Sequence, residues 1–448
     1  MKQIFKNKLL RQPYIIAIYM AIAFCCLLSC KKSKVNTAPA NDTFFKIYNS
    51  QAHPLNPFYI DGFTHDASGN FYAIYRDSNN HRERLMKTDK NGRFLWCKTA
   101  NELLEPTFSW LFSYENFLYV SRGYNSGGSG YANVAEVDKF DTSGKLVSTE
   151  DITLTDNTAY SVFSYNSLSG DFIQYGYNYI ENTLGNRFLP YLRLIDPATG
   201  LVWYKNFFVD TTGMGICKQF WYSPAGIVQT ADKGFTAAFS FSKIPATKLL
   251  DSIFVAFYHF SYDGQLIWQK QIPAGYLWAN LYVIGGSAAS YYSPSNLVPV
   301  SLILDNDSNY VLVLNKQYAS VFSPAVSNSI ELWKLNQNME IIDSAEIKIG
   351  YTLSTPSFSF TVKDDGSYLL IGQSVAPASF VQPAKYYMID IDQSLNVHNI
   401  QQFAPAATQP TLSFPIATGD GHTAACGTIQ NADTTDLFIL KMNLDEKY

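Results

Sequence analysis

The chain has few charged residues, few histidines and almost no helical periodicity. Charged side chains make up 16% of its 448 residues, and there are six histidines. Four of the 33 basic residues precede Cys30, which leaves 29 basic against 37 acidic residues, a net charge of −8, in the remainder. An acidic chain without a basic patch cannot attract a polyphosphate, so we expect no nucleic-acid partner.

Cysteines are too few and too scattered for a disulfide framework or a zinc site. Cys25 and Cys26 lie in an N-terminal apolar run that Cys30 follows, and the others are Cys97, Cys217 and Cys426. The last three fall in different repeats, so a framework of several disulfide bridges is not expected, although a single bridge remains possible. No paired-cysteine or Cys/His spacing indicates zinc, and we expect no metal or cofactor.

The N-terminal sequence resembles an export signal. A basic start precedes an apolar run from Tyr14 to Leu28, which is too short for a comfortable membrane span. The run ends in Leu27-Leu28-Ser29-Cys30, which resembles the lipidation motif of bacterial lipoproteins. That resemblance implies cleavage before Cys30, acylation of its sulfur, and attachment to a membrane of the cell envelope, on the periplasm-facing side or at the cell surface. An ordinary signal peptide and an uncleaved anchor remain open. We therefore expect a signal peptide at 1–29, a tether at 30–42 and one domain at 43–448.

What the chain has in abundance is a repeat. Aromatics make up 15% of the residues, a composition that favours half-buried strands. A unit consisting of a strand, a turn with Asp or Ser and Gly, and a strand with Trp recurs at Arg84–Trp96, Leu192–Trp203 and Tyr258–Trp268. Weaker copies lie at Val137–Val147, Leu332–Ile342, Met388–Ile400 and Phe438–Asp445. A period of roughly 50 to 75 residues predicts an all-β, seven-bladed β-propeller of four-stranded antiparallel blades.

Each unit also begins with a hairpin, whose tight turn carries Gly, Asn or Asp, as at Asp365-Gly366. The first-to-second and third-to-fourth strand connections are therefore short. The second-to-third connections and those between units are long and variable, and a propeller places all of them on one face. Seven such loops are expected there, at 77–83, 123–132, 177–187, 242–251, 272–300, 316–329 and 374–385. Because long, variable loops carry most binding sites, function is expected on this face.

The last unit lacks room for a fourth strand before Tyr448, whereas Phe44–Tyr48 precedes the first unit and has no partner there. We therefore expect Phe44–Tyr48 to complete the last blade and close the ring.

Three segments resemble known propeller repeats. Asp365-Gly366-Ser367-Tyr368 and Lys87–Trp96 are similar to repeats of secreted and lipid-anchored bacterial propellers. Asp196–Trp203 resembles the blade-docking segment of PQQ-like, quinoprotein-type propellers. The calcium ligands, catalytic aspartate and adjacent cysteines of quinoprotein enzymes have no counterpart here, so the resemblance implies the fold and not the cofactor.

Other motifs that could indicate a chemical function are better explained by the fold. Trp96, Trp203 and Trp268 recur at one position of the repeat, which favours packing between blades. Asp305–Asn309 begins like a calcium loop but lacks its glycine and its final glutamate, so a hairpin turn is favoured. The glycine-rich stretch Arg122–Gly130 lacks the lysine of a phosphate loop.

One long connection, Ile272–Val300, is rich in aromatics, which can stack on sugars or anchor a protein. The residues expected to bind a ligand or partner are Trp278, Tyr282, Tyr291 and Tyr292. Packing of this loop onto itself is the alternative. No catalytic set is recognisable, so a monomeric binding or scaffold module for an envelope protein or a glycan is favoured over an enzyme. The alternative is a glycan-active hydrolase or lyase with a site at the ring centre.

Overall fold

Every regular element in the described residues is a β-strand, as the sequence predicts. The computed structural model describes residues 43–48, 57–77, 82–101, 106–124, 134–151, 159–166, 171–180, 187–196, 200–206, 224–243, 250–278, 295–320, 323–348, 352–363, 365–375, 386–403, 410–418, 420, 422–430 and 435–443. Residues 1–42 lie outside this set, so the predicted signal peptide, Cys30 and the tether stay predictions. The described residues include no helix of the length and apolarity that a membrane span requires.

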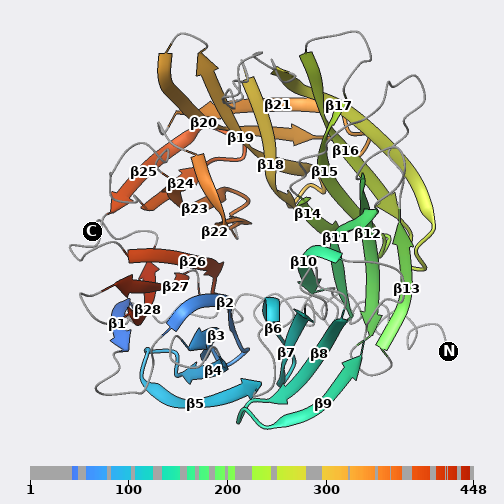
Figure 1. The fold of residues 1–448 in the computed structure, drawn as a ribbon. Coiled ribbons are helices and arrows are strands. Elements are labelled where there is room, and N and C mark those ends of the chain that lie inside the picture. The colour runs from blue at the N-terminus through green and yellow to red at the C-terminus, as the bar shows by residue number, and fades with distance from the viewer. Residues whose placement is uncertain are drawn as a thin grey trace, which may run out of the picture. The chain divides into compact units, whose positions relative to one another are not determined.

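The strands pair into seven four-stranded antiparallel blades arranged in a ring (Figure 1). The first blade contains β2 (Pro57–His65), β3 (Phe71–Asp77), β4 (Glu83–Thr88) and β5 (Phe94–Asn101), and the second β6 (Pro106–Tyr114), β7 (Phe117–Tyr124), β8 (Val134–Asp141) and β9 (Leu146–Asp151). The third contains β10 (Ala159–Asn166), β11 (Phe172–Ile180), β12 (Arg187–Asp196) and β13 (Gly200–Asn206). The fourth contains β14 (Pro224–Gln229), β15 (Phe235–Lys243), β16 (Leu250–Phe260) and β17 (Leu266–Trp278).

The fifth blade contains β18 (Ser295–Leu304), β19 (Tyr310–Ser320), β20 (Ser323–Leu335) and β21 (Ile341–Ile347), and the sixth β22 (Thr352–Val362), β23 (Tyr368–Val375), β24 (Tyr386–Ile391) and β25 (Val397–Phe403). The seventh contains β26 (Pro410–Ala417), β27 (His422–Gln430), β28 (Thr435–Asn443) and β1 (Phe44–Tyr48). In the first six blades the innermost strand comes first along the chain. In the seventh blade β26 is innermost, and β1, from the other end of the chain, supplies the outermost strand.

The predicted closure by the N-terminal strand is confirmed. Strand β1 pairs antiparallel with β28, from Phe44 opposite Lys441 to Tyr48 opposite Leu437. The Tyr48 hydroxyl donates to the Gly92 carbonyl of the first blade at 2.6 Å. Tyr48 also packs in one apolar cluster with residues of the first and seventh blades. One short segment therefore joins the end of the ring to its beginning.

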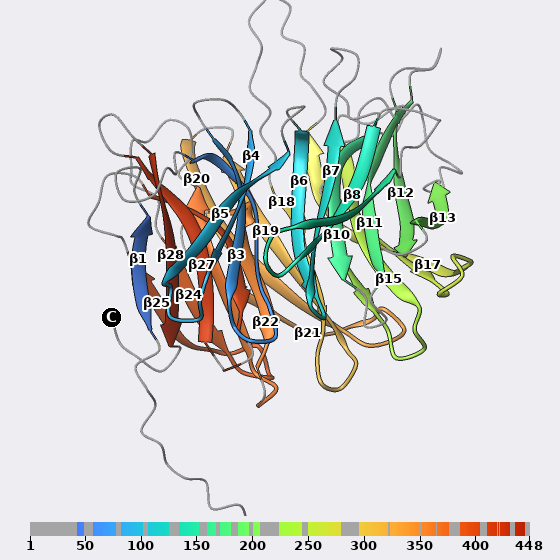
Figure 2. The same cartoon turned by 90° about the horizontal axis from the view of Figure 1, so that it is seen from below.

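Aspartates of the repeat shape the tight turns. In the β4–β5 turn, the Asp89 carboxylate accepts the backbone N–H groups of Asn91 at 2.9 Å and Arg93 at 2.8 Å. Asp66 does the same in the β2–β3 turn. These connections define the short-turn face of the ring, and the opposite end of the blades is the long-loop face (Figure 2).

The repeated tryptophans pack one blade onto the next, as predicted. Trp203, on the outer strand of the third blade, donates its indole N–H to the Tyr262 carbonyl at 2.8 Å, in the β16–β17 turn of the fourth. Gly264 in that turn lies under the indole ring, with φ of +78°. Trp96 meets Gly144 of the second blade in the same way. A glycine is required at this contact because a Cβ there would collide with the indole ring.

We expect Gly264→Ala to destabilise the propeller more than Gly69→Ala does. Both glycines have φ of +78°, but a Cβ at Gly264 would lie 2.7 Å from the Trp203 ring, whereas at Gly69 the nearest atom is 3.4 Å away. The shared backbone cost is about 1 kcal/mol. Overpacking at Gly264 should add about 1–3 kcal/mol. Urea unfolding of the two variants measures the difference, and equal losses would show that Trp203 yields without cost.

The structure departs from the expected blades and loops at two places. The expected loop 316–329 is largely paired, because β19 and β20 continue as a ladder from Lys316 opposite Ser329 to Ser320 opposite Ser323. Strands β17 and β18 also pair at Gly275–Asn296 and Tyr276–Ser295, which joins the fourth and fifth blades into one eight-stranded sheet. Strand formation reaches further toward the long-loop face here than the turn signals predict.

The structure also bears on the Asp305–Asn309 motif and on the cysteines. Asp305 lies in the β18–β19 turn, where its carboxylate accepts backbone N–H groups and forms an ion pair with Lys334 at 2.9 Å, so the hairpin interpretation is confirmed. Cys97 and Cys426 are free thiols, and burial raises the pKa of both. Cys217 lies outside the described residues.

Candidate functional site

The innermost strand of the first blade carries an acidic residue at a break in its pairing. Ile60 pairs with Tyr75 and Gly62 with Ile74, so Asp61 is an extra residue in β2. Such bulges redirect a side chain and recur beside active sites. Gly62 allows the bulge to approach the second blade, since a Cβ there would lie 2.7 Å from the Leu111 Cβ. The local backbone therefore sets Asp61 apart from the regular alternation of the strand.

Asp61 forms a two-pronged ion pair with Arg76 of β3. The Arg76 Nε donates to Oδ2 at 3.0 Å and Nη2 donates to Oδ1 at 3.1 Å. The side chains are 11% and 18% exposed, so the pair is largely buried yet reaches solvent. Burial raises the pKa of Asp61 to about 6, the negative charge of Glu83 adds to this, and Arg76 opposes it. Asp61 thus exchanges a proton near neutral pH.

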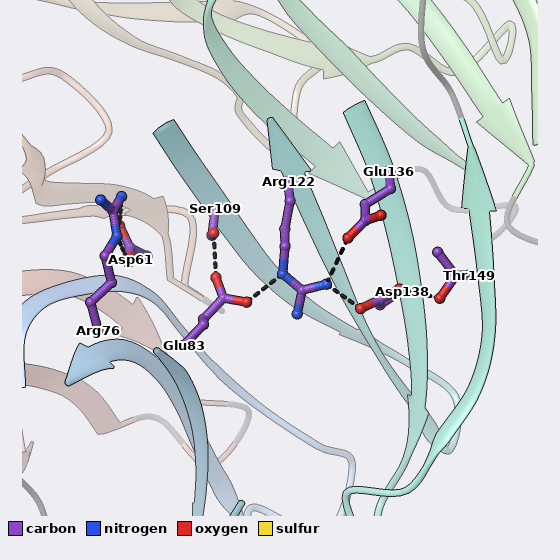
Figure 3. A network of polar contacts seen from close by, with 8 residues as sticks. All are labelled: Asp61, Arg76, Glu83, Ser109, Arg122, Glu136, Asp138 and Thr149. Atoms are coloured by element: carbon purple, nitrogen blue, oxygen red, sulfur yellow. Dashed lines mark hydrogen bonds and ion pairs between the residues drawn. The ribbon is translucent and has the colours of Figure 1, made fainter. Parts of the chain in front are cut away.

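A fully buried guanidinium lies beside this pair (Figure 3). Arg122 of β7 forms ion pairs with Glu83 of β4 and Asp138 of β8, and Glu136 lies 3.6 Å from its Nη1. Ser109 of β6 donates to Glu83, and Thr149 of β9 donates to Asp138 at 2.5 Å. Arg122 therefore links the first two blades and occupies the place among the carboxylates that a cation would otherwise take.

The charges of this cluster do not balance. Its eight side chains are Asp61, Arg76, Glu83, Ser109, Arg122, Glu136, Asp138 and Thr149 (Figure 3). Four are carboxylic acids and two are guanidiniums, so the cluster carries a net charge of −2 when all are ionised. The raised pKa of Asp61 reduces this excess of negative charge near neutral pH.

The cluster belongs to the long-loop face. Arg76 and Arg122 stand near the ends of β3 and β7, and Glu83 begins β4, just after a long connection. The four described histidines, His65, His259, His398 and His422, instead stand next to tight turns. They contact Asp66, Asp232, Asp392 and Asp420 of those turns. Topology therefore separates these imidazoles from Asp61.

We expect the stability contribution of Asp61 to fall as pH rises. Its folded pKa of about 6 lies above its ordinary value near 3.9, so the folded state holds the proton more tightly than the unfolded state. Below about pH 4 the acid is protonated in both states. Between about pH 4 and 6 the unfolded chain alone ionises, and stability should fall by about 2–3 kcal/mol.

Urea unfolding of the wild type and Asp61→Asn at several pH values measures this change. The stability of the wild type minus that of the variant should decline between pH 4 and 7. Asn116→Ser, in the exposed β6–β7 turn, changes no titratable group, is the control, and should show no such trend. A flat difference for Asp61→Asn would mean that Asp61 ionises normally.

The sequence-predicted binding residues lie elsewhere. Trp278 is the last residue of β17, in the fourth blade, and only its backbone is described; Tyr282, Tyr291 and Tyr292 lie outside the described residues. The β17–β18 pairing brings together the two ends of this aromatic segment. Its role in binding therefore stays a prediction, at a place separate from the first blade.

Sequence reasoning missed Asp61, Arg76, Glu83 and Arg122. The signal available was weak: Asp61-Gly62 interrupts an apolar strand, and Glu83 and Arg122 are charged residues at strand ends. Their convergence depends on which blades are neighbours. Within the described part of the chain, no group of three or more His, Cys, Asp or Glu side chains is arranged to hold a metal ion.

Comparison with known proteins identifies the fold and no family. No family model and no curated protein sequence matches the chain. Among solved structures it is similar to an ulvan lyase, described as a new family of polysaccharide lyase and bound to -[GlcA(1-4)Rha3S]-, with a TM-score of 0.51 and 11% identity over 87% of this chain and 95% of the other. The polysaccharide lyase Uly1 gives a TM-score of 0.51 and 9% identity, covering 89% and 92%. An α-L-arabinanase of Penicillium chrysogenum, solved with arabinobiose, gives 0.43 and 10%, covering 74% and 91%.

Proposed function

We propose that this protein cleaves a polysaccharide at the long-loop face of the ring, as a hydrolase or a lyase, with Asp61 as the proton-transferring group. The observation that carries the proposal is the Asp61–Arg76 pair: a carboxyl with a pKa of about 6 on the innermost strand, which is largely buried yet reaches solvent. Proton transfer is most efficient when the pKa of the catalytic group lies near the working pH.

The two reaction types would use the same residues differently. A hydrolase needs a second carboxylate, and Glu136, whose side chain is 26% exposed, is the most exposed of the other acids in the cluster, across Arg122 from Asp61 (Figure 3). In a lyase, ionised Asp61 would take the C5 proton next to a uronate carboxylate while Arg76 stabilises the developing negative charge. The C4–O bond to the leaving sugar would break as the C4=C5 double bond forms, and water would protonate the leaving oxygen. In both, the buried Glu83–Arg122–Asp138 network holds the neighbouring strands in place and touches no substrate.

The comparisons support this direction without establishing it. The similar structures with TM-scores of 0.51 are polysaccharide lyases. They do not support the sequence-based preference for a protein that is not an enzyme. They also do not support a PQQ-type role. At about 10% identity they establish only the propeller. The proposed activity therefore depends on Asp61.

A second part of the proposal concerns location and additional contacts. We propose that the chain is a monomeric lipoprotein of the cell envelope, anchored through Cys30, because a basic start and an apolar run precede that cysteine. The aromatic segment with Trp278, Tyr282, Tyr291 and Tyr292 would stack on the same glycan or hold an envelope protein.

We expect Asp61→Asn to reduce polysaccharide cleavage by about 100-fold or more, because loss of a general acid or base costs about 10²–10⁴ in rate. The assay uses a panel of neutral and uronic-acid polysaccharides, ulvan and arabinan among them. It records new reducing ends and the ultraviolet absorbance of unsaturated products. Hydrolysis produces only the former and elimination produces both.

Asp307→Asn, in the exposed β18–β19 turn on the opposite face, serves as the control and should retain full activity. Wild-type activity that survives Asp61→Asn would refute the assignment. Retention of a polysaccharide by the wild type without any product would favour the binding role instead.

A further inference from the structure

The outermost strands expose large aliphatic side chains at one repeated position. Just after the tight turn into each outer strand, one residue lacks a partner in the ladder. In the first five blades that residue is Leu95, Val147, Val202, Ile267 or Ile342, each between 44% and 58% exposed. In the sixth blade it is His398. The bulge therefore directs an apolar side chain into solvent around most of the ring.

Exposed apolar side chains concentrate on these strands. Among the described residues, the large hydrophobic side chains that are exposed lie on outer strands in all seven blades, with the single exception of Tyr262, which lies in the turn before β17. Strand β1 contributes Phe45 and Ile47. Edge strands ordinarily avoid such residues because they invite association. The apolar rim, defined as the five bulged aliphatic residues Leu95, Val147, Val202, Ile267 and Ile342, is therefore a candidate contact surface.

The N-terminal part of the chain joins the ring on the same side as this rim. Phe44 packs against Gly92, in the β4–β5 turn, so Thr43 lies at the short-turn face. Ahead of Thr43 the sequence holds a basic start, the apolar run Tyr14–Leu28 and Cys30. Residues 31–43 can span at most about 45 Å when fully extended.

We propose that the short-turn face rests on a lipid bilayer through the apolar rim, so that the long-loop face and Asp61 point away from the membrane. A lipid surface fits the chemistry because the exposed side chains of the rim are aliphatic. The proposal holds whether Cys30 is acylated or the apolar run remains as an anchor, and it is independent of any glycan activity.

The test is site-specific thiol labelling of the full chain in its native membranes. Asn116→Cys places a thiol in the exposed β6–β7 turn on the short-turn face, and Lys348→Cys places one just after β21 on the long-loop side. A water-soluble maleimide should label Asn116→Cys at least about five-fold more slowly in membranes than after detergent release. Lys348→Cys should label at the same rate in both.

Further variants assign the protection to the rim. Adding Val202→Ser and Ile267→Ser should restore rapid labelling of Asn116→Cys, whereas Ile400→Ser, an equally apolar exposed residue set back along β25, should not. Slow labelling of Asn116→Cys in a soluble chain that starts at Asn41 would indicate contact with a second copy and overturn the proposal. Equal rates at both positions in membranes, or absence of the full chain from the membrane fraction, would also overturn it.

Discussion

Replacing Arg122 by methionine should destabilise the propeller by about 3–5 kcal/mol at neutral pH. The guanidinium is fully buried and forms ion pairs with Glu83 and Asp138, whose side chains are also buried. Removal of one partner of a buried ion pair leaves uncompensated charge in a medium that solvates it poorly. The two carboxylates must then either take up protons or draw in water, and both cost stability.

Urea unfolding at pH 7 measures the loss, and Arg82→Met, at an exposed position ahead of β4, is the matched control with a small effect. Arg122→Lys should recover only part of the loss, since an ammonium cannot reproduce the planar contacts of a guanidinium. A loss under about 1 kcal/mol for Arg122→Met would show that the network is dispensable.

A chain that starts at Asn49 should be less stable than one that starts at Asn41, by on the order of 5 kcal/mol. The shorter chain lacks β1, and with it the five-residue ladder to β28, the buried Tyr48 ring and the packing of Phe44 on Phe71. Burial of each large apolar side chain contributes about 1.5–3 kcal/mol. The exposed edge of β28 should also promote aggregation.

Thermal unfolding and light scattering of the two chains measure these effects. In the longer chain, the double variant Phe45→Ser/Ile47→Ser changes only half-exposed side chains of the same strand and should lower the melting temperature much less than the loss of β1 does. Similar stability of the two chains would mean that the ring closes without β1.

The fold was predictable because each repeat carries its own turn chemistry. The carboxylate of Asp89 accepts two backbone N–H groups, and Gly264 makes room for Trp203, so the residues that define the repeat also produce its geometry. Closure by Phe44–Tyr48 followed from a missing strand. The continuous sheet of the fourth and fifth blades did not, since the residues that pair, such as Tyr276 and Ser295, carry no distinguishing signal.

The candidate site was not predictable, because its contacts cross between blades. Glu83 and Arg122 are 39 positions apart in the sequence and meet only because the first and second blades are neighbours. Asp61 titrates near pH 6 because burial and Glu83 act on it together, and neither effect is visible in a strand read alone. The sequence did predict function on the long-loop face, where these residues lie. That prediction rested on the long, variable loops and the aromatic segment Ile272–Val300, and not on the charged residues.

Hydrogen exchange of the Asp61→Asn variant, with and without each polysaccharide of the panel, tests most directly whether the long-loop face at the first blade binds a glycan. We expect one polysaccharide to slow exchange in peptides covering residues 57–63 and 72–77 and to leave the tight-turn peptides unchanged. Protection confined to the tight turns, or unchanged exchange with every polysaccharide, would contradict it.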